Sequence, residues 1–161
     1  RLARTVRSGR FEGRFDSAFD RVVRACAETP RGHEDGTWIT PEMQDADARL
    51  HRLGLARSVE AWRDGELVGG VYGVLAGRCF CGESMFHAET DASKVALVAL
   101  VERLADEGFD MLDCQVRSEH LMSLGAREVP RDEYLMRLGR GYADAAPRAG
   151  ARRGAPSRLA R

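Results

Sequence analysis

An acid and an amide lie two residues apart in the segment MLDCQV, which otherwise has the composition of a buried strand. Residues two apart in a strand point to the same side, so we expect Asp113 and Gln115 to lie side by side, with Cys114 on the other side. A carboxylate that loses contact with water needs hydrogen-bond partners or changes its pKa. This cost favours a functional site, and a buried pair satisfied by backbone groups is the alternative.

A second acid follows the end of another apolar segment, in CGESMF. Glu83 comes directly after Gly82, whose missing side chain gives access to the backbone. By itself, Glu83 has the character of a surface carboxylate. Together with Asp113 and Gln115 it indicates a shared pocket at the ends of neighbouring strands, where an anionic Glu83 suits a cationic group of a substrate.

Other candidate residues give less specific signals. Trp38 in GTWIT stands just before an expected helix, either as a core anchor or as a platform on which a base stacks. GGVYG puts three glycines in one strand, which predicts a bulge or the close approach of another group. The four histidines form no pattern of a hydrolase triad. Cys79 and Cys81 have no second ligand pair at zinc spacing, so we expect no metal.

The composition is that of one globular domain with balanced charge. The chain has 161 residues and a formal net charge of zero, which argues against a broad basic surface but allows a small site for one end of an RNA. The longest apolar run, VALVALV, is much shorter than the roughly 20 residues of a membrane span. We therefore expect a cytoplasmic protein without membrane contact, whose cysteines are reduced core thiols. A domain over residues 1–139 is predicted, followed by a disordered Ala/Arg/Gly/Pro tail over residues 140–161.

Apolar periodicity and turn residues predict the elements that position these side chains. Residues 10–15 have the pattern of a strand, and Asp16 is expected to cap the helix that follows. Thr40 and Pro41 begin the next helix, which Gly54 ends. Four side chains of that helix are predicted to face the core: Met43, Ala46, Leu50 and Leu53.

The second half of the chain is predicted to complete a mixed sheet. Asp64-Gly65 is a hairpin signal, and a third strand over residues 78–86 is expected to run antiparallel to the second. Further expected elements are a long helix over residues 91–107, the strand with Asp113, a short helix over 118–126, an edge strand over 126–129 and a last helix over 130–138. Strands joined in this way indicate an α/β (α+β) fold with a mixed, mostly antiparallel sheet flanked by helices.

Several long segments resemble one protein family. HEDGTWITPEM, RSVEAWRDGELVGGVYGVLAGRCFCGESMF, LDCQV and SLGAREVPRDEYL are similar to the bacterial leucyl/phenylalanyl-tRNA–protein transferases. The resemblance runs from Arg1 to Leu138 and implies a core like that of the GNAT acetyltransferases. It also implies an aminoacyltransferase that moves Leu, Phe or Met from aminoacyl-tRNA to the N-terminal Arg or Lys of proteins. The product is thereby marked for degradation by the N-end rule pathway.

The resemblance assigns roles residue by residue. Asp113 and Gln115 of LDCQV match the pair credited with catalysis, and Glu83 of GESMF matches the glutamate that recognises the acceptor Arg or Lys. Trp38 matches a tryptophan near the terminal adenosine of the tRNA. Positions around the apolar pocket for the transferred side chain are matched by Val71, Phe80, Gly82 and Leu104.

The implied reaction is aminolysis of an activated ester, for which no cofactor or metal is required. A neutral amide does not take up a proton, so Gln115 is expected to orient the attacking amine. Asp113 would fix Gln115 or accept the proton through water. We expect a monomer whose partners are aminoacyl-tRNA and acceptor proteins.

The sequence also departs from the family pattern. The small N-terminal domain of the family is expected to be missing. Asp47 stands where an aromatic residue is common, Arg57 where histidine is common, and His87 where serine is common. Leu104 and Val71 change the usual pocket lining, which leaves the preference for Leu, Phe or Met open.

Two other functions fit a fold of this kind. The first is an acetyl-CoA-dependent N-acetyltransferase, which would cradle pyrophosphate on a glycine-rich turn before the long helix. Here that turn is ETDASKVAL, without glycine and with two acids that repel phosphate. The second is a binding module without catalytic activity.

Overall fold

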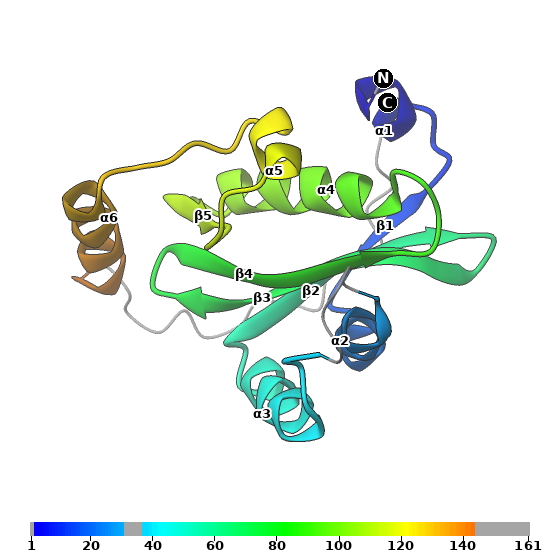
Figure 1. Ribbon diagram of the computed structural model, residues 1–161, viewed down its shortest axis with the longest axis horizontal. Helices are drawn as coiled ribbons and strands as arrows, with labels where there is room; N and C mark the ends of the chain where they lie inside the picture. Colours follow the sequence, from blue (N-terminus) through cyan, green and yellow to red (C-terminus); the bar gives the residue numbers. More distant parts are fainter. Residues whose placement is uncertain (1, 31–36, 144–161) are drawn as a thin grey trace.

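A mixed sheet forms the centre of the computed structural model, which describes residues 2–30 and 37–143. Its five strands follow one another in chain order, β1-β2-β3-β4-β5 (Figure 1). The strands from β1 to β4 are antiparallel neighbours, and β5 runs parallel to β4. Their bounds are β1 Glu12–Phe15, β2 Ala56–Arg63, β3 Glu66–Ala76, β4 Cys79–His87 and β5 Met111–Asp113. The predicted fold class is confirmed.

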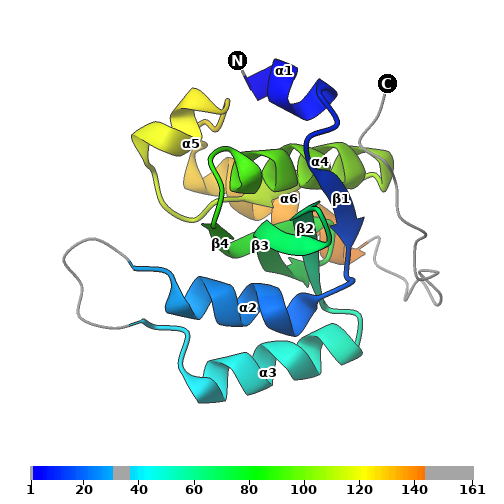
Figure 2. The same ribbon diagram turned by 90° about the vertical axis from the view of Figure 1, so that its right-hand side faces the viewer.

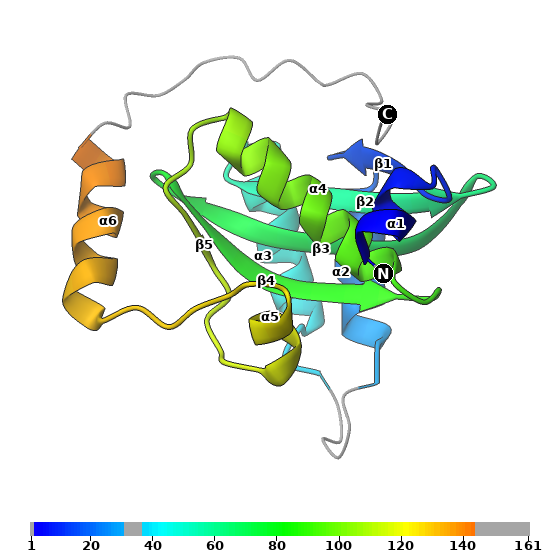
Figure 3. The same ribbon diagram turned by 90° about the horizontal axis from the view of Figure 1, so that it is seen from above.

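Helices cover both faces of this sheet (Figure 2). On one face lie α1 Leu2–Arg7 and the long helix α4 Ala92–Asp106, and on the other α2 Phe19–Glu28 and α3 Pro41–Arg52. The remaining helices are α5 Glu119–Ser123 and α6 Arg131–Ala143. α6 lies at one end of the molecule, next to the turn that joins β3 to β4 (Figures 1 and 3).

Two features of the strands depend on special backbone geometry. Asp64 and Gly65 join β2 to β3 with positive φ angles of 51° and 82°, so the hairpin prediction is confirmed. The register shifts once between β2 and β3, at Ala61/Trp62, and once between β3 and β4, at Tyr72/Gly73. The second shift is a bulge in β4, and Glu83 is its extra residue.

The glycines of β3 allow close packing, as the sequence suggested. A Cβ atom on Gly69 would lie 2.6 Å from the Cβ atom of Ala92, at the start of α4. A Cβ atom on Gly73 would lie 2.2 Å from the carbonyl oxygen of Cys81 and 2.4 Å from the ring of Phe80. The approaching groups therefore belong to the protein's own helix and neighbouring strand.

The start of α3 agrees with the prediction, whereas the predicted cap of α2 is wrong. Thr40 caps α3 by accepting a hydrogen bond from the backbone nitrogen of Met43. Asp16 does not cap α2 with its side chain. Its carboxylate accepts from the backbone nitrogen of Ser58 at 2.9 Å and from Nε of Arg57 at 2.6 Å, which ties the end of β1 to β2.

The inward face of α3 also differs from the prediction. Leu50 packs on the core, but Met43 and Ala46 are exposed and Leu53 is 72% exposed. The residue that α3 buries most completely is Asp47, which is 4% exposed. A polar residue in this place obscured the true periodicity of the helix.

The end of the chain departs from the prediction at two points. β5 is an edge strand, and residues 126–129 form no further strand beside it. α6 continues to Ala143, so the first residues of the predicted tail are helical, and residues 144–161 lie outside the described part. Among the helices of the described residues, none is long and apolar enough to cross a membrane.

Candidate active site

Asp113 is the last residue of β5, and Gln115 lies beyond the strand. Oδ1 of Asp113 accepts a hydrogen bond from the backbone nitrogen of Gln115 at 2.8 Å. Gln115 has a φ of 62°, a left-handed conformation that is uncommon for residues other than glycine. The sequence predicted that the two side chains share one face of a strand. This prediction is wrong, because Gln115 lies outside β5. The carboxylate of Asp113 contacts the backbone of Gln115, not its side chain.

The side chain of Gln115 reaches across to β4. Its Nε2 atom lies 3.0 Å from the carbonyl oxygen of Gly82 and 3.5 Å from Oε1 of Glu83. Both neighbours accept hydrogen bonds, so the amide nitrogen must face them and Oε1 must face the other way. An acceptor atom is thus presented on the side of Gln115 that is directed away from β4.

Glu83 owes its position to the bulge in β4. Tyr72 pairs with Ser84 and Gly73 pairs with Gly82, so Glu83 is the extra residue between two paired positions. The parallel pairing of β4 with β5 ends just before this bulge, at Cys81 and Asp113. The predicted residues Gly82, Glu83, Asp113 and Gln115 therefore gather where the two strands separate.

Sequence reasoning missed one member of this group. Tyr134 of α6 donates a hydrogen bond from its hydroxyl to Oδ2 of Asp113, at 3.0 Å. This hydrogen bond is the largest cause that raises the pKa of Tyr134, to about 12. The sequence marks Tyr134 only as one residue of an expected helix, and no pattern connects it with a strand end that lies 21 residues earlier.

The site is rich in carboxylates. Burial raises the pKa of Glu83, the nearby Asp47 and Asp113 raise it further, and the hydrogen bond from Gln115 opposes the shift. None of the ion pairs in the described part of the chain involves Asp47, Glu83 or Asp113. A cationic group that entered here would relieve the repulsion between these acids.

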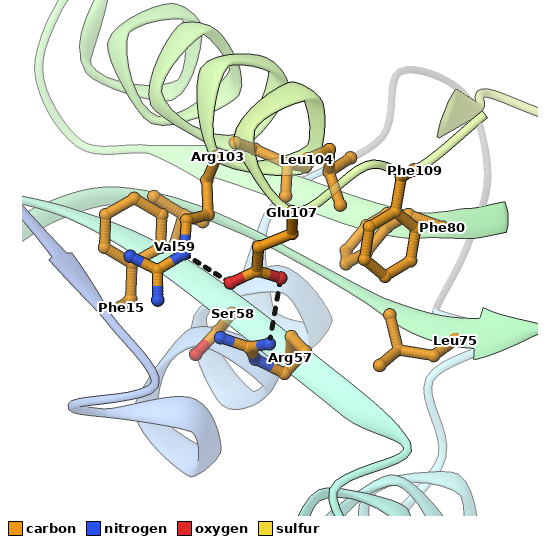
Figure 4. A pocket seen from close by; sticks show the side chains of 11 residues that line it. Phe15, Arg57, Ser58, Val59, Leu75, Phe80, Arg103, Leu104, Glu107 and Phe109 are labelled. Atoms are coloured by element: carbon orange, nitrogen blue, oxygen red, sulfur yellow. Dashed lines mark hydrogen bonds and ion pairs between the residues drawn. The ribbon is translucent and has the colours of Figure 1, made fainter. Parts of the chain in front are cut away.

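Two of the predicted pocket residues line a cavity between α4 and the sheet (Figure 4). Phe80 and Leu104 face this small space of about 10 Å³, together with Phe15, Leu75, Leu100 and Phe109. One side is polar, because Arg57 lies 3.6 Å from Glu107, which also pairs with Arg103. Val71 is buried in the same core cluster but does not line the cavity, and Gly82 lies by Asp113 instead.

The remaining candidates lie apart from these two places. Trp38 precedes α3 and is 46% exposed, next to the buried Ile39. Cys79 and Cys81 are free thiols with sulfur atoms 3.9 Å apart, and burial raises the pKa of both. Within residues 2–30 and 37–143, no group of three or more His, Cys, Asp or Glu side chains is placed to hold a metal ion.

Comparison with known proteins identifies the family. The family model described as "Leucyl/phenylalanyl-tRNA protein transferase" matches residues 1–139. The chain belongs to this family. A leucyl/phenylalanyl-tRNA–protein transferase of Dechloromonas aromatica is 54% identical over 147 residues, which is 91% of this chain and 63% of that protein. Another, of an Anaeromyxobacter species, is 58% identical over 86% of this chain and 59% of its own length.

The chain therefore spans about six tenths of the length of these members of the transferase family. Solved structures with a similar fold include acetyltransferases. The aminoglycoside N-acetyltransferase AAC(6')-Iy in complex with CoA has a TM-score of 0.53 at 15% identity, over 75% of this chain and 90% of that one. A ribosomal-protein-alanine N-acetyltransferase from Brucella melitensis has a TM-score of 0.53 at 12% identity, over 74% and 92%. At such identities the likeness concerns the fold alone.

Proposed function

We propose that the chain transfers Leu, Phe or Met from aminoacyl-tRNA to the N-terminal Arg or Lys of acceptor proteins. Membership in the transferase family supports this reaction class. The observation that carries the proposal is the fixed amide of Gln115, whose nitrogen is bound to β4 and whose Oε1 is left to accept. In this reaction the acceptor protein would be marked for degradation by the N-end rule pathway, and the enzyme would act in the cytoplasm as a monomer.

The chemical step needs positioning more than acid–base chemistry. The nitrogen of the acceptor amine attacks the ester carbonyl carbon, the new C–N bond forms, and the ester C–O bond breaks. The ribose oxygen leaves as a hydroxyl after taking up a proton, and the amine gives up a proton to water. Oε1 of Gln115 accepts a hydrogen bond from the attacking amine and so directs its lone pair toward the carbonyl. Asp113 holds Gln115 through its backbone nitrogen.

The donor is bound at two places in this proposal. The cavity with Phe80 and Leu104 is apolar over most of its lining, which suits a Leu, Phe or Met side chain. Val71 packs in the core cluster next to this pocket, Gly82 lies beside Asp113, and Trp38 stacks on the terminal adenosine. The cavity of about 10 Å³ is smaller than a Leu side chain, so binding of any of these side chains requires its lining to move apart.

The acceptor is bound by charge. Glu83 lies within 3.5 Å of the Gln115 amide, so a cation on Glu83 brings the amine of the same residue close to Gln115. A charge-assisted hydrogen bond to Glu83 favours Arg and Lys over neutral side chains at the N-terminus.

The test is a transfer assay with Leu-charged tRNA and peptides that begin with Arg, Lys or Ala. It is run with this chain alone and with the chain joined to the unmatched part of one of its relatives. Transfer to the Arg and Lys peptides, with little to the Ala peptide, is the expected result. Absence of transfer from both forms would contradict the proposal. Tight binding of CoA in calorimetry would favour the acetyltransferase instead, although the turn before α4 contains Glu89 and Asp91 and no glycine.

A further inference from the structure

Tyr134 connects α6 to the candidate active site. The hydroxyl of Tyr134 donates to Oδ2 of Asp113, while Oδ1 of the same carboxylate accepts from the backbone nitrogen of Gln115. Both oxygens of Asp113 are therefore held, one by each neighbour. α6 lies at the end of the molecule, and residues 126–130, which lead to it, have no regular structure (Figures 1 and 3).

Tyr134 is a neutral phenol near neutral pH, so its hydroxyl can donate to Asp113. The hydrogen bond to Asp113 raises the pKa of Tyr134 to about 12, so its phenol keeps its proton. It cannot serve as a base for the acceptor amine under these conditions. Its hydrogen bond to a carboxylate is charge-assisted and directional, which fixes the rotation of the Asp113 side chain.

The consequence for Gln115 follows from its backbone. A φ of 62° is unfavourable for glutamine and needs support from its surroundings. The support comes from Asp113 on the backbone nitrogen and from Gly82 on the side-chain amide. If Asp113 turned, the first of these contacts would be lost and Oε1 of Gln115 would no longer be held in one direction.

We propose that Tyr134 is a positioning residue for aminoacyl transfer, which acts through Asp113 on the orientation of Gln115 and makes α6 part of the active site. This inference rests on the proposed function for its kinetic part. Its structural part, the coupling of Tyr134 to Gln115, is independent of any activity. The alternative is that Tyr134 only attaches α6 to the sheet and contributes to stability.

A double-mutant cycle separates these roles. Transfer to an Arg-starting peptide is measured at saturating charged tRNA for Tyr134→Phe, Asp113→Ala and the double variant. Tyr134→Phe is expected to lower kcat about tenfold or more, with little change in the KM for the peptide. In the Asp113→Ala background, the same substitution should have no further effect, because Tyr134 has no carboxylate left to hold. Equal losses in both backgrounds would overturn the proposal.

The matched control is Leu135→Ala, which shortens an exposed neighbour on α6. This variant should keep the kcat of the unaltered chain. If Leu135→Ala lowers kcat as much as Tyr134→Phe does, any disturbance of α6 is sufficient, and the specific role of the hydroxyl is wrong.

Amide hydrogen exchange by NMR gives a readout that needs no activity. Loss of the Tyr134 hydroxyl is expected to speed exchange of the Gln115 backbone amide severalfold, because Asp113 then holds it less firmly. Leu135→Ala should leave that rate unchanged. Unchanged exchange in Tyr134→Phe would contradict the coupling. If Tyr134→Phe speeds this exchange but the unaltered protein shows no transfer, the proposed function is wrong and the structural coupling is still supported.

Discussion

The two places that the resemblance assigns to the substrates are built in different ways. Under α4, Phe80, Leu100 and Leu104 pack against one another, and contact between apolar side chains determines the shape of the cavity. At the edge of the sheet, Asp113 and Gln115 at the end of β5 meet Tyr134 of α6 through hydrogen bonds. The shape of the first place depends on the volumes of its side chains, and that of the second depends on the directions of its hydrogen bonds.

Unusual backbone geometry occurs at the edge and elsewhere. The region under α4 also has a register shift, at Ala61/Trp62, and a left-handed residue, Asp91, just before the helix. At the edge, two such features are in contact, since Nε2 of the left-handed Gln115 lies 3.5 Å from Oε1 of Glu83 in the bulge. Such features are costly for the fold and persist where they aim particular side chains. We therefore expect substitutions at the edge to lower activity more than stability, and substitutions under α4 to lower stability more than activity.

The largest effect is expected at the edge. Gln115→Ala removes the acceptor atom, and Asp113→Asn leaves one carbonyl oxygen for two donors. Each should lower transfer by about a hundredfold, on the order of 3 kcal/mol, the typical cost of losing one positioned polar group at such a site. Thermal unfolding should be nearly unchanged. Transfer at full rate in both variants would show that the edge has no catalytic role.

The next effect is expected at Gly73, which packs on the Phe80 ring and also pairs with Gly82 beside the bulge. Gly73→Ala would place a Cβ atom 2.2 Å from the carbonyl oxygen of Cys81, and strand backbone cannot easily move away. We expect the free energy of unfolding to fall by about 3 kcal/mol, as in other overpacked sites. Urea denaturation measures it. Gly139→Ala is the control, since nothing lies within 4 Å of its added methyl group, and it should not destabilise the chain.

The regular elements of the fold were the part that the sequence predicted well. The hairpin at Asp64-Gly65, the cap at Thr40 and the long helix before β5 follow from local rules of turn geometry and periodicity. The inward face of α3 was predicted wrongly. The residue buried there is Asp47, and a polar side chain interrupts the apolar pattern on which the prediction depends. Residues 126–129 have alternation typical of a strand, but strand formation also needs a partner edge, which no local pattern reveals.

The candidate site was predicted in its members but not in its geometry. Asp113, Gln115 and Glu83 were recognisable because polar residues interrupt apolar segments. Their contact depends on the bulge at Glu83 and on the left-handed conformation of Gln115. Neither can be predicted from the sequence, because glutamine rarely adopts this conformation. Tyr134 could not be found at all, since its partner lies on another element and tyrosine is unremarkable on a half-exposed helix.

A smaller effect tests whether the edge also selects the acceptor. Glu83→Gln keeps the shape of the side chain but removes its charge. The KM for Arg- and Lys-starting peptides should rise by about tenfold or less, the difference between a charged and a neutral hydrogen bond. Transfer to a small uncharged amine should change much less, because the donor side is unaltered. If both reactions decline equally, Glu83 supports the site as a whole and does not read the acceptor charge.

The smallest effect concerns Asp47, a buried polar residue of α3, on the other face of the sheet from α4. Burial raises the pKa of this carboxyl group, and Tyr72 opposes the shift only in part. A carboxyl whose pKa is raised by folding stabilises the fold fully below its unfolded pKa of about 3.9, and this contribution is lost as the pH rises through the raised value. Asp47→Asn removes the ionisation, so the variant should gain stability relative to the unaltered chain as the pH rises from about 4 to about 8.

Urea denaturation over this pH range measures the gain, with a scale of about 1.4 kcal/mol for each pKa unit that folding adds. Asp45→Asn, at an exposed position of the same helix, is the control for the loss of one negative charge. The gain should be confined to Asp47→Asn and should disappear toward acid pH, where Asp47 is protonated. A loss of stability at neutral pH would mean that Asp47 is held as an anion by its surroundings. In that case the buried face of α3 would depend on directed polar contacts, as the sheet edge does, and not on packing alone.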